Sequence, residues 1–162
     1  MTRKSALAVA PNGDSHDGDD HANNINLRES PGHLLRRAQQ RAVEIYLDEV
    51  GEDGLRPPQF ALLLTVYQNG GLNQTELVQH TGIDRSTLAD MIARLEKRGL
   101  LRRKPGEDQR TRHIWVTDAG RAAVEANAAA AQRAQDRIMA PIAPDDREQF
   151  LRLLGRIADL PH

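Results

Sequence analysis

Cysteine is absent from this chain of 162 residues, and its absence excludes several classes of protein. Without thiols there is no disulfide framework, no thiolate-bound metal and no thiol redox switch. Aromatic residues are also few, at 3%, so a core must be built largely from Leu, Ile, Val and Ala side chains. Helix formers dominate the second half of the chain, and these features together favour a mostly α-helical fold.

Long apolar runs are missing as well. None approaches the roughly 20 residues that a membrane-spanning helix requires. The stretch Ser5–Ala10 is too short for the hydrophobic region of a secretory signal. We therefore expect a cytoplasmic protein.

Net charge is nearly absent too, at −1, but the charges are unevenly distributed. Residues 1–30 carry three basic and five acidic side chains, whereas residues 73–112 carry nine basic and six acidic ones. A basic middle on a near-neutral chain is what a phosphate-contacting surface would produce. Basic patches are also common without any ligand, so a solvated face is the alternative.

The first 30 residues are predicted to form a polar tail. Residues 11–24 consist mostly of Asp, Asn, Gly, His and Ser, which cannot bury enough apolar surface to offset the entropy lost on ordering. His16 and His21 lie among four aspartates and could ligate a metal, but their spacing supports no defined site. We favour a solvated acidic tail and expect neither a metal nor a cofactor.

Hydrophobic periodicity predicts six helices in the remainder of the chain. In order they span residues 31–50, 57–69, 76–80, 85–98, 118–139 and a last segment whose apolar stripe is Phe150, Leu153, Leu154, Ile157 and Leu160. Capping residues support the starts of three of them. Asn73 forms a variant of the capping box with Glu76, and Asp84 and Thr117 each precede a helix.

The middle of the chain combines two motifs. The two short helices on either side of Thr81-Gly82 make a helix-turn-helix. Two strand patterns, residues 100–104 and 113–116, flank the turn residues 105–108 and predict a β-hairpin, or wing. The expected fold is therefore mostly α with a small β-hairpin wing.

The helix after Asp84 has two distinct faces. At 100° per residue one side collects the apolar residues Leu88, Met91, Ile92 and Leu95, which are expected to pack inward. The far side collects small and polar residues, namely Ser86, Asp90, Ala93 and Lys97, flanked by Thr87, Ala89 and Arg94. Such a face can approach base edges closely, as a recognition helix does in a major groove. An ordinary solvated face is the alternative.

The wing favours the nucleic-acid interpretation. Arg102, Arg103 and Lys104 are consecutive on its first strand, and Arg110 and Arg112 follow the turn. The narrow minor groove concentrates negative potential, and an arginine side chain fits there. A basic hairpin directly after a helix-turn-helix is difficult to explain by solubility alone.

These segments resemble one known family. Asp84–Arg103 is similar to the recognition helix and first wing strand of MarR-type regulators, Asp108–Arg112 to their Asp-x-Arg wing signature, and Thr117–Gly120 to their Thr-x-x-Gly helix start. The resemblance extends over about residues 32–160. Ala143 departs from it, because the family often has a Ser or Thr cap there.

The resemblance implies a domain organisation and a homodimer. Residues 1–30 would be a flexible polar tail and residues 31–162 a MarR-type domain. Its dimerisation helices would be residues 31–50 and 118–160, and its winged helix-turn-helix lobe about residues 57–117. The long alanine-rich helix and the apolar stripe of the last helix agree, because both need close helical partners.

The implied function is a transcriptional regulator, most simply a repressor released from a pseudo-palindromic operator by a small molecule. Arg110 is expected in the minor groove, with Asp108 orienting the wing by pairing with Arg94. Gln74 and Thr75 are expected to contact phosphate. The full set of predicted DNA-binding residues is Gln74, Thr75, Arg85, Ser86, Thr87, Asp90, Arg94, Lys97, Arg102, Lys104, Asp108, Arg110 and Arg112.

The resemblance also places an effector between the dimerisation helices and the DNA-binding lobe. Arginines beside aromatic and aliphatic walls would suit an aromatic carboxylate or its coenzyme A thioester. The candidate ligand residues are His33, Arg36, Arg37, Arg41, Phe60, Leu64 and Tyr67. Alternatively, the arginines form a solvated face and the apolar residues are core.

The sequence also bears on two other classes of function. An enzyme is disfavoured, because the sequence has no paired histidines at helical spacing, no nucleophile elbow and no phosphate-binding loop. We expect no catalytic residues. A winged helix used only for protein contacts, without sequence-specific DNA binding, remains the alternative, and the basic wing argues against it.

Overall fold

The computed structural model describes residues 26–106 and 111–159. The contacts within it divide the chain into two units, Met1–Arg36 and Arg37–His162. The boundary falls inside helix α1 (Pro31–Val50). Within the described part of the chain, no helix is both long and apolar enough to cross a membrane.

The first unit contains a short 3₁₀ helix, η1 (Leu27–Glu29), and residues 31–36 of α1. The side chain of Asn26 accepts a hydrogen bond of 3.1 Å from the amide of Arg28. The predicted polar tail therefore contains one ordered turn at its end. The two histidines considered as metal ligands, His16 and His21, lie outside the described residues.

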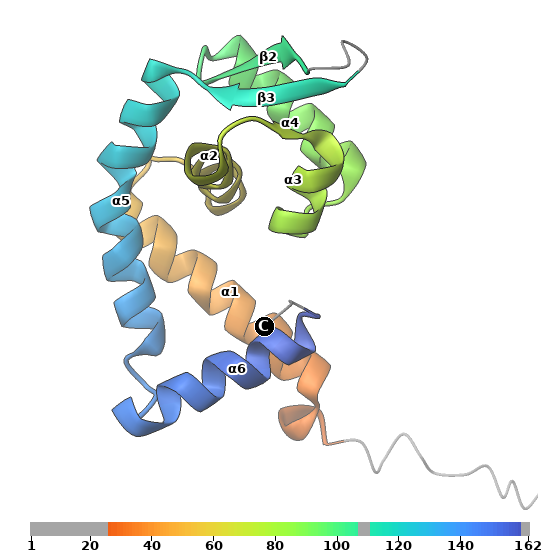
Figure 1. Ribbon diagram of the computed structural model, residues 1–162. Helices are drawn as coiled ribbons and strands as arrows, with labels where there is room; N and C mark the ends of the chain where they lie inside the picture. The colour runs from red at the N-terminus through yellow and green to blue at the C-terminus, as the bar shows by residue number, and fades with distance from the viewer. Residues whose placement is uncertain (1–25, 107–110, 160–162) are drawn as a thin grey trace, which may run out of the picture. The chain divides into compact units, whose positions relative to one another are not determined.

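The second unit contains the remaining elements, and it confirms the mostly helical class (Figure 1). In chain order these are α2 (Pro57–Asn69), β1 (Leu72–Asn73), α3 (Gln74–Thr81), α4 (Arg85–Lys97), β2 (Leu101–Pro105), β3 (Arg112–Val116), α5 (Asp118–Met139), η2 (Pro144–Asp146) and α6 (Arg147–Ile157).

The predicted helix caps are present. The side chain of Asn73 accepts hydrogen bonds from the amides of Thr75 and Glu76 at 2.9 and 3.0 Å, and Glu76 returns one to the amide of Asn73 at 2.7 Å. Asp84 caps α4 by accepting a hydrogen bond from the amide of Thr87, and Thr117 caps α5 by accepting one from the amide of Gly120. These side chains satisfy amides that the first turn of a helix leaves without partners.

The sheet has one strand more than the hairpin that the sequence predicts. Its order is β1-β3-β2, and Leu72 of β1 pairs with Ile114 of β3. A strand of two residues is too short to show an alternating pattern, so periodicity could not reveal it. Pro105, expected in the turn, is instead the last residue of β2 and pairs with Arg112. Proline is tolerated there because β2 is an edge strand.

Two apolar clusters hold the second unit together. The larger lies under the sheet and joins α2, α3, α4 and the start of α5, with Leu62, Leu77 and Leu88 fully buried. The smaller joins the end of α1 to α5 through Ile45, Tyr46, Ala131 and Ala134. The sequence assigned the alanines of α5 to close contacts between helices. Part of that role is fulfilled within the protomer, because the small side chain of Ala134 lets α1 approach α5 closely.

A polar junction connects α4, β2 and α5. The hydroxyl of Thr117 donates to the carbonyl of Gly99 at 2.6 Å and accepts a hydrogen bond from the amide of Gly120 at 3.0 Å. Gly120 itself is buried, and a Cβ atom there would overlap the carbonyl oxygen of Leu100. The Thr-x-x-Gly motif therefore fixes the start of α5 against the turn after α4.

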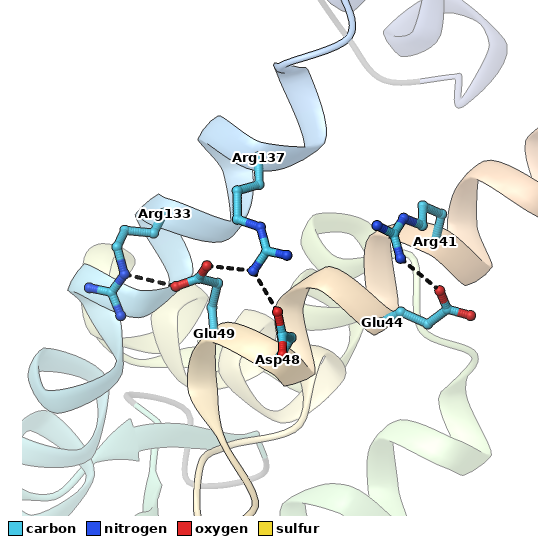
Figure 2. A network of polar contacts seen from close by, with 6 residues as sticks. All are labelled: Arg41, Glu44, Asp48, Glu49, Arg133 and Arg137. Carbon is cyan, nitrogen blue, oxygen red and sulfur yellow. Dashed lines mark hydrogen bonds and ion pairs between the residues drawn. The ribbon is translucent and has the colours of Figure 1, made fainter.

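Ion pairs also connect α1 with α5, as Figure 2 shows. Glu49 accepts hydrogen bonds from Arg133 at 2.8 Å and from Arg137 at 2.6 Å, and Arg137 also reaches Asp48 at 2.7 Å. The hydrogen bond from Arg133, followed by that from Arg137, lowers the pKa of Glu49. We refer to these four side chains as the α1–α5 ion-pair network.

Helix α6 presents apolar side chains that the protomer does not cover. Phe150, Leu151, Leu153 and Ile157 are exposed, with Ile157 at 64% of its full accessibility. No residue of α6 is buried. Such a face on a surface helix requires a partner.

Candidate nucleic-acid interface

The faces of α4 are those that its sequence predicts. Leu88, Ile92 and Leu95 are buried against the larger cluster, and Met91 packs beside them. The predicted contact residues on the other side are all exposed, namely Arg85, Ser86, Thr87, Asp90, Arg94 and Lys97. The inward stripe therefore fixes which side chains of α4 another molecule can reach.

The start of α4 is organised around one carboxylate. Asp84 accepts a hydrogen bond from the hydroxyl of Ser86 at 2.7 Å and another from the amide of Thr87 at 2.9 Å. Hydrogen bonding by the Thr87 side chain and backbone, and then by Ser86, lowers the pKa of Asp84 from its usual 3.8 to about 2. Because the Ser86 proton points to Asp84, its oxygen meets an incoming group as an acceptor.

The starts of α3 and α4 lie beside each other. The guanidinium of Arg85 donates to the hydroxyl of Thr75 at 2.9 Å, and the amide of the Gln74 side chain donates to the carbonyl of Arg85 at 3.3 Å. The structure thus brings together three residues that the sequence assigned to DNA. A polar hollow between this corner and the wing is lined by Asn73, Gln74, Thr75, Thr111 and Arg112.

The strand register divides the basic residues of the wing between two faces. Arg102 lies opposite Trp115 and Lys104 opposite His113, so these four side chains share one face of the sheet. Arg103 lies on the other face, where its guanidinium pairs with Glu96 of α4 at 3.2 Å. Arg102 and Lys104 are exposed, as a phosphate contact requires.

Two predicted wing residues, Asp108 and Arg110, lie outside the described residues. Their roles, including the pairing of Asp108 with Arg94, stay predictions. Arg94 is exposed on α4 and lines a small hollow with Asp90 and Gln59, the last from α2. Gln59 was not among the predicted residues, because nothing in the pattern of α2 indicated that it lies near α4.

The candidate ligand residues fall in both units. His33 and Arg36 belong to the first unit. In the second unit Arg37 and Arg41 are exposed on α1, and Arg41 pairs with Glu44 at 3.2 Å. Their role in binding an effector stays a prediction.

The apolar candidates on α2 are half-buried. Phe60, Leu64 and Tyr67 all pack against the larger cluster, so they serve the core while part of each remains exposed. The ring of Phe60 lies 6.1 Å from that of Tyr46, and the guanidinium of Arg121 lies 5.1 Å from the ring of Tyr67.

Sequence analysis missed Tyr46. Its ring is 6% exposed and its hydroxyl, among the described residues, has no hydrogen-bond partner. Burial raises the pKa of this phenol. Tyr46 follows Ile45 on α1, and this position in the sequence could have indicated that the ring is buried. It could not have indicated that the hydroxyl lacks a partner.

Comparisons with known proteins agree on one family. The model of the MarR family matches residues 55–111. The HTH-type transcriptional repressor NicR of Pseudomonas putida is 29% identical over 134 residues, which cover 82% of this chain and 85% of that protein.

Solved structures match over nearly their whole length. The transcriptional repressor CouR bound to a 23-mer DNA duplex is 36% identical with a TM-score of 0.73, covering 82% of this chain and 94% of CouR. A second structure shows CouR bound to p-coumaroyl-CoA. BpsR of Bordetella bronchiseptica, whose DNA binding is regulated by 6-hydroxynicotinic acid, is 30% identical with a TM-score of 0.76, covering 83% of this chain and 98% of BpsR.

Proposed function

The chain belongs to the MarR family of transcriptional regulators, and from that premise we propose that it is a homodimeric repressor that an aromatic acid or its coenzyme A thioester releases from its operator. It acts on DNA in the cytoplasm and performs no catalysis. The observation that carries the DNA-binding part is the exposed face of α4 beside the basic wing, on a chain similar to a repressor seen on a DNA duplex.

The residues around α4 divide into two roles. Ser86, Thr87 and Asp90 face the major groove, where their oxygens accept hydrogen bonds from the exocyclic amines of adenine or cytosine. The corner made by Gln74, Thr75 and Arg85 binds phosphate, since the side-chain amide of Gln74, the hydroxyl of Thr75 and the guanidinium of Arg85 converge there. Phosphate contacts set the orientation of the protein, and the groove contacts supply sequence preference.

On the wing, Arg102, Lys104 and Arg112 add phosphate contacts beside the minor-groove Arg110. The exposure of the first three supports this assignment. Each cation that neutralises a phosphate releases bound counterions, so affinity for DNA falls steeply as salt rises.

The effector proposal rests on two relatives and on the chemistry of α1 and α2. CouR is seen with p-coumaroyl-CoA, and 6-hydroxynicotinic acid regulates BpsR. Both molecules join an aromatic ring to an acidic or anionic group. In the second unit the partly exposed rings of Phe60 and Tyr67 would contact the aromatic part, and Arg37 and Arg41 would bind the anion.

Tyr46 supports an effector site near Phe60. A buried hydroxyl without a partner is unfavourable by about 1–3 kcal/mol, and a polar atom of a bound molecule could satisfy it. To release DNA, the effector must bind the DNA-free conformation more tightly than the DNA-bound one, because a ligand shifts an equilibrium only by its differential affinity.

The DNA-binding proposal is tested with Arg110→Ala. Operator fragments are first selected from genomic DNA by binding to the wild-type protein. The variant should lose about 1–3 kcal/mol of specific binding, measured by fluorescence anisotropy. Arg152→Ala, which removes an exposed arginine of α6, is the matched control and should bind like the wild type. Equal operator affinity in all three proteins would contradict the assignment of Arg110.

The effector proposal is tested by calorimetry with aromatic acids and their coenzyme A thioesters. A molecule that releases the operator should bind Arg41→Ala more weakly than the wild type. Tyr46→Phe should also bind it more weakly if the phenol contacts it. If the releasing molecule binds both variants as tightly as the wild type, these residues are not its site, and release only by metals or peptides would overturn the effector class.

A further inference from the structure

One face of the sheet carries a tryptophan that the proposed function does not use. Trp115 lies on β3 on the same face as Arg102, Lys104 and His113. Its side chain is 36% exposed although tryptophan is a large apolar residue. An exposed tryptophan among cations on a β-hairpin is unusual for a purely structural residue, because aromatic side chains are favoured where they meet a partner.

Two consecutive glycines, Gly70 and Gly71, lie against the ring of Trp115. The indole lies across Gly71 so closely that a Cβ atom on this residue would overlap the ring. Gly70 also approaches it, with a Cβ there lying 3.8 Å from the ring. The Gly70-Gly71 turn between α2 and β1 therefore leaves room for the indole to pack against the backbone, while 36% of the Trp115 side chain stays exposed.

A cation lies over the tryptophan. The ammonium of Lys104 is 5.3 Å from the centre of the indole ring. This cation–π contact keeps the lysine side chain above the sheet, where its charge remains available. In this position Lys104, Trp115 and His113 border a surface hollow together with Asn73, Pro105, Gly106 and Thr111.

This hollow continues the polar one at the start of α3. Asn73 and Thr111 line both of them. Of the described residues that line the two hollows, the charged ones are the cations Lys104 and Arg112. A strand of phosphates contacted by the start of α3 would therefore pass next to Lys104 and the exposed part of Trp115.

We propose that the Trp115 face, defined as Lys104, His113 and Trp115, is a contact surface for the sugar–phosphate backbone of duplex DNA flanking the site read by α4. Lys104 neutralises a phosphate, and the indole packs against the deoxyribose beside it. The surface extends the interface without reading bases, so it adds affinity and not sequence preference. The inference rests on the proposed DNA-binding function.

The chain provides its own probe for this contact, since Trp115 is its one tryptophan. Emission excited at the red edge of the tryptophan absorption therefore reports on this position alone. The experiment titrates full-length protein at low salt with a random-sequence duplex of about three helical turns. A gel shift on the same samples shows independently whether DNA is bound.

The expected result is a change in Trp115 emission that saturates together with the gel shift. Lys104→Gln should reduce the slope of log affinity against log salt by about one, because one phosphate contact is lost. Arg103→Gln is the matched control, since Arg103 pairs with Glu96 on the opposite face, and its slope should equal that of the wild type. Trp115→Ala should bind more weakly than Trp115→Phe, which retains an aromatic surface.

The outcomes separate the inference from the function on which it rests. A normal gel shift without any change in emission, or with Lys104→Gln and Arg103→Gln of equal slope, would overturn the inference and leave the DNA-binding function standing. No gel shift with any DNA would overturn the function itself. Circular dichroism of each variant shows whether it is folded. If Trp115→Ala is not folded, Trp115→Phe still tests the inference.

Discussion

Individual side chains decide where the elements of this protein begin. Asn73, Asp84 and Thr117 each accept hydrogen bonds from amides of the helix that follows. All three were identifiable from sequence, because a capping side chain acts on residues two or three positions away. The packing of Trp115 against Gly71 was not identifiable in this way, since the contact joins two segments far apart in the chain. Local chemistry is visible in a sequence, whereas contacts across the fold are not.

Gly120 allows a direct test of the junction at the start of α5. Alanine normally stabilises a helix relative to glycine by about 1 kcal/mol. At position 120, however, the added Cβ would overlap the carbonyl oxygen of Leu100 and lie 2.8 Å from Val116. We expect Gly120→Ala to lower the free energy of unfolding by about 1–3 kcal/mol in urea denaturation.

Gly32→Ala is the control for this substitution. Gly32 also lies in a helix, and apart from its chain neighbours and the nearby backbone of that helix no described atom lies within 4 Å of a Cβ built there. It should leave stability unchanged or raise it. A stable Gly120→Ala protein would show that the turn after α4 can move away from α5.

The carboxylate of Asp84 should titrate at unusually low pH. Its pKa of about 2 lies below the usual 3.8, so the ionised cap stabilises the fold above about pH 3.8 and this contribution is lost as pH falls toward 2. An NMR titration of the carboxyl carbon should give a midpoint near 2. Thr87→Ala should raise the midpoint, because the Thr87 side chain is the largest cause of the shift. An unchanged midpoint in that variant would assign the shift to other groups.

At the scale of elements, periodicity predicted the helices well and the sheet less well. The bounds of α1, α2 and α5 follow their apolar stripes and caps. Strand β1 was missed because two residues carry no period. The register of β2 and β3 could not be derived either, and it is this register that separates Arg103 from Lys104 and so decides which cations face outward.

The α1–α5 ion-pair network should hold the end of α1 against α5. In Arg137→Ala, amide hydrogen exchange should become faster in the last turns of α1, while the larger cluster keeps its protection. Arg41→Ala is the matched control, because Arg41 pairs with Glu44 one turn away on the same helix and both side chains are 67% exposed. Equal exchange in the two variants would mean that the apolar cluster alone holds α1.

The same network predicts a dependence on pH. Because the folded protein lowers the pKa of Glu49, the stability that this carboxylate contributes is present above about pH 4.5 and is lost as pH falls through its folded-state pKa. Glu49→Gln should therefore show a smaller loss of stability on acidification than the wild type. Urea denaturation at a series of pH values measures the difference.

At the scale of the whole molecule, the uncovered face of α6 fits the homodimer of the family. The apolar stripe of the last helix was visible in the sequence, but only the structure shows that the protomer leaves it exposed. A two-fold dimer places two copies of α4 about one turn of DNA apart. The operator should then be a pseudo-palindrome with half-sites near 10 base pairs apart.

The dimer is tested by placing charge on this face. Burying a leucine or isoleucine side chain contributes about 1.5–3 kcal/mol, so Leu153→Glu and Ile157→Glu should each weaken the dimer by at least about tenfold. Both residues are exposed in the protomer, at 42% and 64%, so its fold should be retained. Sedimentation at micromolar concentration should show a dimer for the wild type and more monomer for the variants.

Arg152→Glu changes charge on the same helix outside the apolar stripe and is the control. If Arg152→Glu weakens the dimer as much as Ile157→Glu does, the weakening is caused by the change in net charge and not by loss of apolar contact. A wild-type monomer that still protected a symmetric footprint on DNA would contradict the assembly altogether.

The hydrogen bonds of Thr117 have a mechanical consequence. They attach the start of α5 to the carbonyls that follow α4, so the first turn of α5 and this turn of the winged lobe move together. With 22 residues, α5 is a lever about 33 Å long, and tilting it by about 5° displaces its far end by roughly 3 Å. A small molecule that changes the direction of α5 at any point along its length would therefore swing the recognition helix out of register with its groove, without altering a single contact inside the lobe.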